Sequence, residues 1–222
     1  MSNPVKTNFK TEWFAVALII LGFLAGFYFY RHFPSLVPTH WNIQGEVNGY
    51  SRPFAAAFAI PLMMLGLYLI FTFLPYLDPK KEQYANFASV YHHFKDLIVT
   101  FLFVLYMMAS LSGLGYKINI SFWAPVLVGL LFIIIGLLLE KVKTNWFLGI
   151  RTPWTMSSEK VWAKTHQLSS RVLVLAGLLI AATVLVPALF KTILFILAVA
   201  LIVFGLPVYS YFLYAREKKE KK

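Results

Sequence analysis

The sequence predicts an all-α integral membrane protein with about six transmembrane helices and both termini in the cytoplasm. Of its 222 residues, 59 % are hydrophobic and only 13 % are charged, which is far from the balance of a soluble domain. Six apolar stretches are long enough to cross a bilayer, and the basic residues are unevenly distributed between them. The absence of Cys excludes a disulfide scaffold and a thiolate metal site.

Six stretches contain no Asp, Glu, Lys, Arg or His over lengths close to the 20 or so residues that a transmembrane helix needs. They comprise residues 13–30, 54–76, 97–116, 122–139, 172–190 and 192–214. Because these runs are continuous rather than alternating, a transmembrane β-barrel is excluded. We expect one membrane domain over residues 1–222, with a first three-helix half at 13–116 and a second at 122–214. Gly22 and Gly26 either let another helix pack closely on the first span or are a chance spacing.

The Lys and Arg residues predict the orientation. With both termini inside, 16 of the 20 basic residues lie in cytoplasmic segments, and only Arg31, Arg52, Lys117 and Lys191 lie outside. The net charge of +11 would favour nucleic acid as a partner in a soluble protein. Here topology accounts for that charge, so we expect no direct nucleic-acid binding.

The outer connection, residues 31–53, contains a dense row of polar side chains. Pro34 and Pro38 stiffen it, and turns are expected at 42–45 and 48–49. The polar residues beside Trp41 are His40, Asn42, Gln44, Glu46 and Asn48. They could cap the helix ends, form a ligand surface, or build a metal or acid–base site from His40 and Glu46. A zinc site needs three or four ligands, which one His and one carboxylate do not supply.

The inner connection, residues 140–171, is the second polar segment. Gly149 marks a turn, and Thr152 before Pro153 predicts an extended step. Ser157 is expected to cap a helix on which Glu159, Trp162 and His166 share one face. On this face, Glu159 and His166 could act as an acid–base pair. Alternatively, the helix is an amphipathic helix at the membrane interface, and its Lys and Arg side chains contact anionic membrane lipids. In the other inner connection, His92 and His93 are expected to be solvated or interfacial.

Together the two segments resemble a known family. The run from Pro38 to Gly45 is similar to the Pro-x-His-[aromatic]-Asn-x-x-Gly signature of DUF1648 membrane domains. The run from Asn145 to Thr155, followed by Glu159, Trp162 and Thr165-His166, resembles the second signature of the SdpI/YfhL family. These motifs and their surroundings supply the candidate ligand-binding residues: His40, Trp41, Asn42, Gln44, Gly45, Glu46, Arg52, Asn145, Trp146, Gly149, Arg151, Thr152, Pro153, Trp154, Glu159, Trp162 and His166.

The resemblance implies a multi-pass protein of the bacterial plasma membrane that gives immunity to a secreted antimicrobial peptide toxin. Signalling to a cytoplasmic transcriptional repressor is a second implied role, and no catalytic residue, metal or cofactor is implied. An uncoupled transporter of a peptide or lipid is the alternative, although the spans lack the ionisable residues that mark ion pathways. A membrane enzyme is less favoured, because no nucleophile–base pair or metal constellation is found on one side of the bilayer.

Overall fold

The structure is a computed structural model that describes residues 4–42 and 44–220, so Ile43 of the outer motif lies outside the described residues. Within those ranges, six helices are long and apolar enough to cross a membrane, which confirms the predicted all-α multi-pass fold, whereas the cytoplasmic location of both termini stays a prediction. The long helices are α1 (Phe9–His32), α2 (Pro53–Leu77), α3 (Ala88–Gly113), α4 (Ile120–Leu139), α6 (Glu159–Ala182, extended by η2, Thr183–Leu185) and a last one built from three consecutive segments. Those segments are α7 (Ala188–Ala200), the π-helical η3 (Leu201–Gly205) and α8 (Leu206–Glu220).

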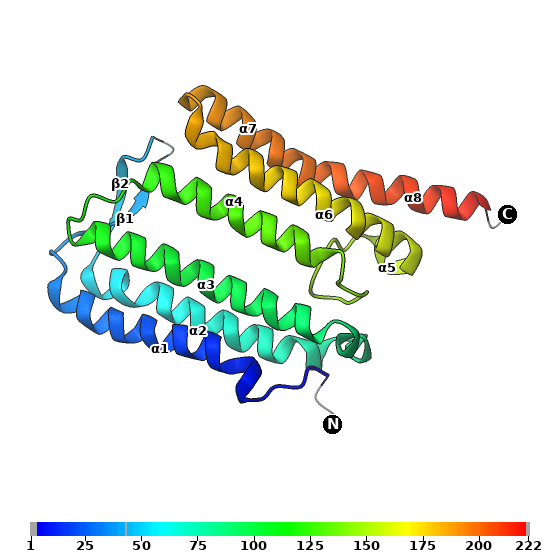
Figure 1. Cartoon of the computed structure of the whole chain (residues 1–222), viewed down its shortest axis with the longest axis horizontal. Coiled ribbons are helices and arrows are strands. Elements are labelled where there is room, and N and C mark those ends of the chain that lie inside the picture. Colours follow the sequence, from blue (N-terminus) through cyan, green and yellow to red (C-terminus); the bar gives the residue numbers. More distant parts are fainter. Residues whose placement is uncertain (1–3, 43, 221–222) are drawn as a thin grey trace. The chain divides into compact units, whose positions relative to one another are not determined.

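The remaining elements lie in the connections (Figure 1). Strands β1 (Val37–Trp41) and β2 (Val47–Ser51) form an antiparallel hairpin between α1 and α2. The short helix η1 (Lys81–Asn86) precedes α3, and α5 (Pro153–Ser157) precedes α6.

Two helices begin much earlier than the predicted spans. Helix α3 begins at Ala88 rather than at residue 97, and α6 begins at Glu159 rather than at residue 172. Charged residues end a lipid-length apolar run, but they do not end a helix, and no Gly or Pro interrupts either segment before Gly113 and Gly177. The expected interfacial helix and the fifth span are therefore one continuous helix.

The chain forms two compact units, and helices α2, α3 and α4 contribute to both. Of the described residues, the N-terminal unit comprises 7–73 (without 43) and 95–127, and the C-terminal unit comprises 4–6, 74–94 and 128–220. These units do not follow the predicted division into three-helix halves, which stays a prediction.

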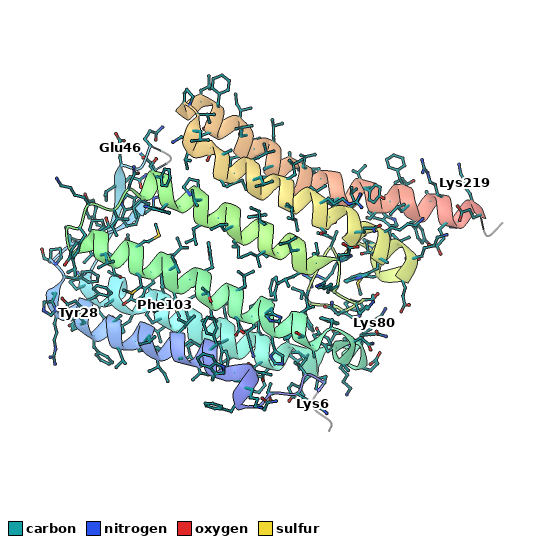
Figure 2. The ribbon with its side chains drawn as sticks, viewed as in Figure 1. Lys6, Tyr28, Glu46, Lys80, Phe103 and Lys219 are labelled. Atoms are coloured by element: carbon teal, nitrogen blue, oxygen red, sulfur yellow. The ribbon has the colours of Figure 1, made fainter. Side chains whose placement is uncertain are left out.

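Helices α1 and α2 lie side by side in the N-terminal unit (Figure 1). A Cβ on Gly26 would lie 2.9 Å from the backbone oxygen of Ala57, so the small residue permits the close approach of the two helices. Phe103 of α3, labelled in Figure 2, packs against a core cluster that α1, α2 and α3 share. Its fully or nearly buried members are Ala15, Ile19, Met64 and Val99.

The C-terminal unit has its own core. Ala176 and Ile180 of α6 pack with Ala198 of α7. A Cβ on Gly177 would lie 2.5 Å from the backbone oxygen of Gly129, so α4 and α6 cross closely at a pair of glycines. Of the two histidines expected to be solvated or interfacial, His93 is exposed, whereas His92 is buried with Nε2 3.3 Å from the Lys6 carbonyl oxygen and is not solvated.

An ion pair lies between the helices of the N-terminal unit. Lys95 of α3 is only 1 % exposed, and its Nζ lies 2.5 Å from Oε2 of Glu12 in α1. Tyr68 of α2 donates its hydroxyl to the same oxygen at 2.8 Å, and its ring centre lies 4.9 Å from the ammonium. A buried charge requires such partners. The membrane-length helices therefore contain a buried ion pair, although the predicted spans contain no ionisable residue, so a lack of such residues does not count against transport.

Candidate functional site

Asn42 closes the turn of the hairpin, as the sequence predicts for residues 42–45. Its main-chain N–H donates to the Glu46 carbonyl, and its own carbonyl accepts from the Gly45 N–H, both at 2.9 Å. The side-chain Oδ1 accepts from the N–H groups of Gln44 at 3.0 Å and Glu46 at 2.9 Å. The side-chain Nδ2 donates to the Glu46 carboxylate at 2.9 Å. Asn42 is therefore an organiser of the turn more than a free ligand contact.

Two glycines of the hairpin are needed for different reasons. Gly45 has a φ of +84°, and a Cβ there would lie 2.5 Å from Cβ of Ser121 at the start of α4. Gly49 lies inside β2 rather than in the predicted second turn, which corrects that expectation. A Cβ on Gly49 would lie 2.8 Å from Cβ of His40, so its absence lets the paired strands approach at an irregular part of the register.

His40 and Glu46 do not share a site. His40 Nδ1 lies 2.5 Å from Oδ1 of Asn48, whereas Glu46 is bound by Asn42. The acid–base and metal interpretations of this pair therefore have no geometric support. His40, Gln44, Glu46 and Arg52 are exposed and Trp41 is half-buried, so the hairpin presents polar side chains next to an accessible indole. Glu46 marks the hairpin in Figure 2.

An apolar groove runs along α1 and α2 from the end at which the hairpin joins them. Its volume is about 520 Å³. Aromatic side chains from both helices line it, and Arg31 lies at the end of α1; the lining residues are Phe23, Phe27, Tyr30, Arg31, Phe54, Phe58 and Leu62. The polar hairpin and the aromatic groove are thus neighbours in the chain and lie at the same end of the α1–α2 pair.

Asn145 organises the second polar segment, residues 140–158, which we call the motif loop. It is 0 % exposed. Its Nδ2 donates to the carbonyls of Lys143 at 2.8 Å and Leu148 at 2.9 Å. Its Oδ1 accepts from the N–H groups of Phe147 at 2.9 Å and Leu148 at 2.6 Å. Every hydrogen-bonding position of the amide is filled, so the side chain acts as a buried scaffold for the loop.

Asp78, in the segment after α2, forms a hydrogen bond to the motif loop. This residue is not among those that the sequence predicts for the site. The carboxylate is 2 % exposed and accepts from the Trp146 N–H at 2.9 Å and the Lys80 N–H at 2.7 Å. Tyr84 of η1 donates its hydroxyl to Asp78 at 2.8 Å. Burial, together with Asp78, raises the pKa of Tyr84, so this hydroxyl stays protonated and keeps donating. The only local signal was an Asp directly before Pro79, which is typical of a turn.

His166 holds the centre of the motif loop and is 0 % exposed. Its Nδ1 donates to the Trp162 carbonyl at 2.9 Å, and its Nε2 accepts from the Ile150 N–H at 3.1 Å, which defines a neutral imidazole. The ring stacks on Trp162 at 4.0 Å between centroids. Gly149 has a φ of +116°, and a Cβ there would collide with His166 Nε2. Glu159 is exposed, and backbone groups occupy both nitrogens of His166, so the predicted acid–base pair is not formed.

The short helix α5 connects the motif loop to α8. Thr152 caps α5 with Pro153 at its first position, and Thr152 Oγ1 lies 3.0 Å from Ser210 Oγ. The ring of Trp154 packs edge-on against Tyr211 at 5.2 Å. Because α5 ends at Ser157, Ser158 rather than the predicted Ser157 caps α6.

Trp146 and Arg151 are exposed residues of the motif loop that are joined by a hydrogen bond. Trp146 is 50 % exposed, and its carbonyl accepts from Nη1 of the exposed Arg151. In contrast, Asn145, Thr152, Trp162 and His166 are buried. The structure therefore collects the predicted residues of the motif loop in the C-terminal unit and those of the hairpin in the N-terminal unit, and it assigns most of the former to holding the loop.

Six membrane-length apolar helices with two structured polar segments define a multi-pass membrane protein. Residues 141–210 match the SdpI/YfhL protein family, and residues 17–65 match the Domain of unknown function DUF1648. Immunity protein SdpI of Bacillus subtilis (strain 168) is 30 % identical over 172 residues, which cover 78 % of this chain and 80 % of that protein. The chain belongs to the SdpI/YfhL protein family and is a multi-pass protein of the bacterial plasma membrane. No solved structure is significantly similar to it.

Proposed function

We propose that the protein gives its cell immunity to a secreted antimicrobial peptide toxin. The observation that carries this proposal is the 30 % identity to the Bacillus subtilis immunity protein, which extends over 80 % of that protein. An identity sustained over 172 residues extends far beyond one short common motif.

The hairpin and the neighbouring groove support this proposal by their chemistry. A membrane-active peptide has an apolar and a polar face, and the groove of about 520 Å³ offers aromatic side chains for the first. The hairpin offers His40, Gln44 and Glu46 for the second. Trp41 is an aromatic anchor of the type that dominates binding energies, and Pro38 limits the freedom lost on binding.

The proposal requires the hairpin to face the outside of the cell. The distribution of 16 basic residues against four supports both termini in the cytoplasm. Because the chain contains no Cys, single Cys probes can be interpreted directly. An impermeant thiol reagent should label Asn48→Cys in intact cells but not Lys160→Cys, and the reverse pattern would contradict this orientation.

The direct test is to challenge a sensitive host with the candidate toxin peptide, with and without the protein. Cells that carry the protein should survive concentrations that kill the control cells. Equal killing, at a membrane abundance confirmed by immunoblotting, would refute the immunity proposal.

Signalling to a cytoplasmic transcriptional repressor is the finer part of the proposal. Trp146 and Arg151 support it, because exposed Trp and Arg residues are enriched at protein interfaces. A candidate repressor encoded beside the gene should be recruited to membranes that contain the protein, and Trp146→Ala should abolish the recruitment. Unchanged recruitment by Trp146→Ala would remove the motif loop from this role.

A further inference from the structure

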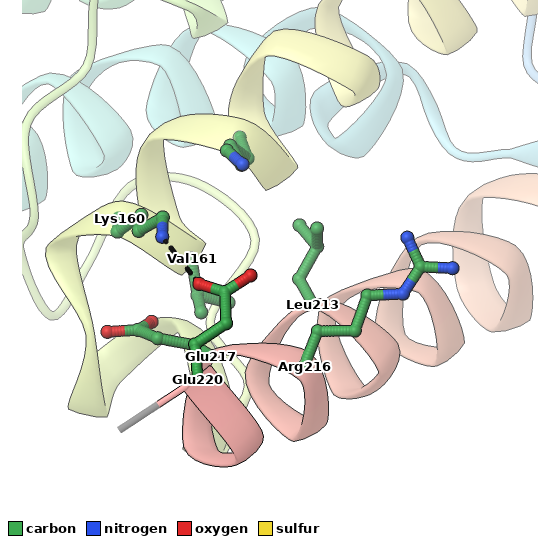
Figure 3. A pocket seen from close by; sticks show the side chains of 7 residues that line it. Lys160, Val161, Leu213, Arg216, Glu217 and Glu220 are labelled. Carbon is green, nitrogen blue, oxygen red and sulfur yellow. Dashed lines mark hydrogen bonds and ion pairs between the residues drawn. The ribbon is translucent and has the colours of Figure 1, made fainter. Parts of the chain in front are cut away.

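A second cavity lies between the start of α6 and the end of α8 (Figure 3). Its volume is about 130 Å³, and charged side chains from both helices line it. Lys160 and Lys164 come from α6, whereas Leu213, Arg216, Glu217 and Glu220 come from α8. None of these residues belongs to the hairpin or the motif loop, so the function proposed above does not use this cavity.

The two carboxylates of the cavity already have partners. Glu217 accepts from the Ser158 hydroxyl at 2.6 Å, and Glu220 pairs with Lys160 at 3.2 Å. In Figure 3 the guanidinium of Arg216 points away from both carboxylates, on the other side of Leu213. Among residues 4–42 and 44–220, no carboxylate pairs with Arg216 or Lys164. Two cations are therefore available to a ligand.

Neighbouring residues place the cavity at the depth of lipid headgroups. Tyr211, which packs on Trp154, lies on α8 shortly before Leu213, and aromatic residues of this type collect at the membrane–water boundary. The sequence of α8 changes from apolar to charged shortly after Tyr214, where three basic residues and two glutamates follow. The cavity thus lies where an apolar helix pair meets the polar phase.

We propose that this cavity binds the phosphate of an anionic membrane lipid. Arg216 offers a planar fork that binds two phosphate oxygens, and Lys164 adds a second positive charge from the facing helix. Leu213 provides an apolar contact beside them for the start of the acyl chains. Basic pockets between membrane helices on the cytoplasmic side favour anionic headgroups for these reasons. This proposal is independent of toxin immunity.

The test uses the full chain in nanodiscs of phosphatidylcholine and phosphatidylglycerol, with native mass spectrometry to count the retained phosphatidylglycerol. The double variant Lys164→Gln/Arg216→Gln should lower the apparent affinity by about tenfold or more. The matched control is Lys218→Gln/Lys219→Gln, which removes the same amount of charge from α8 outside the cavity and should change the affinity by less than about twofold. Equal losses in the two double variants would overturn the proposal.

A second arm distinguishes a lipid from free phosphate. A millimolar excess of inorganic phosphate should leave phosphatidylglycerol bound, because phosphate lacks the acyl chains that Leu213 contacts. Displacement would assign the site to free phosphate and overturn the lipid as its ligand. Thermal unfolding verifies that each variant folds. If the double variant does not, the single Arg216→Gln replaces it, with an expected loss of about threefold.

Discussion

The hairpin and the motif loop are both organised by an Asn side chain, but the His that accompanies each of them, His40 in the hairpin and His166 of α6 beside the motif loop, is used in an opposite way. In the hairpin, His40 is exposed and shares one hydrogen bond with Asn48. Asn145 of the motif loop and His166 of α6, which holds that loop, are buried and form hydrogen bonds only to backbone groups. An exposed hydrogen bond can be exchanged for one to water or a ligand at small net cost, whereas a buried one cannot. The His therefore belongs to a contact surface in the hairpin and to a scaffold at the motif loop, whereas Asn42 and Asn145 both organise backbone.

The comparison separates stability from recognition. Changes to buried polar residues of the motif loop should destabilise the protein, because each leaves backbone groups without partners. Changes to exposed hairpin residues should alter function at nearly constant stability.

The largest effect is expected for Asn145→Ala. This change leaves two N–H groups and two carbonyls without their side-chain partner, of which the N–H and the carbonyl of Leu148 are buried, at a cost of about 2–4 kcal/mol in the free energy of unfolding. The matched hairpin variant, Asn48→Ala, loses one exposed bond and should cost less than about 1 kcal/mol. Denaturant unfolding in detergent micelles measures both. Similar costs would show that the motif loop is no more of a scaffold than the hairpin.

Gly149→Ala sharpens the role of His166. Its Cβ would be forced against Nε2 of the imidazole at a backbone φ of +116°. Gly115→Ala is the control, because Gly115 has a φ of +93° and no atom lies within 4 Å of its added Cβ. Backbone strain costs each variant about 1–2 kcal/mol, and the collision should add about 2 kcal/mol to Gly149→Ala alone. Equal thermal unfolding midpoints for Gly149→Ala and Gly115→Ala would mean that the motif loop shifts away from His166 without loss of stability.

Arg151→Lys should have the smallest effect on stability and a clear effect on function. Arg151 is exposed, so the free energy of unfolding should change by less than about 0.5 kcal/mol. The planar guanidinium of Arg151 donates to the Trp146 carbonyl and has further N–H groups for a ligand, whereas the Lys ammonium lacks this geometry. We therefore expect Arg151→Lys to impair protection more than Lys143→Ala, an exposed cation of the same loop, at equal membrane abundance. Identical protection by the two variants would leave Arg151 without a special role.

The sequence predicts features that depend on neighbours along the chain. Lipid-length apolar runs identify the membrane helices, and the hairpin turn follows from the residues between Asn42 and Gly45. The irregular backbone at Gly149 is also a local property. These features need no knowledge of distant partners, and the structure confirms them.

The features that escaped prediction join residues far apart in sequence. Asp78 binds the Trp146 N–H, which lies 68 positions further on, and Lys95 pairs with Glu12 over 83 positions. Near the end of an apolar run, a charged residue that is buried and paired in the fold cannot be distinguished by sequence from one that is exposed to solvent. Its partner becomes visible only when the helices pack, and this explains both the missed ion pair and the wrong expectation for His92.

The most direct test of the account is Trp41→Ala in the toxin challenge, with Trp123→Ala as an exposed tryptophan outside the hairpin. If the hairpin is the recognition surface, Trp41→Ala should weaken toxin binding by about 30-fold, as for the loss of a central aromatic anchor. Protection should then fall to that of cells without the protein, while the unfolding midpoint stays close to wild type and Trp123→Ala remains protective. Full protection by Trp41→Ala at normal abundance would contradict the account and remove the hairpin as the recognition surface.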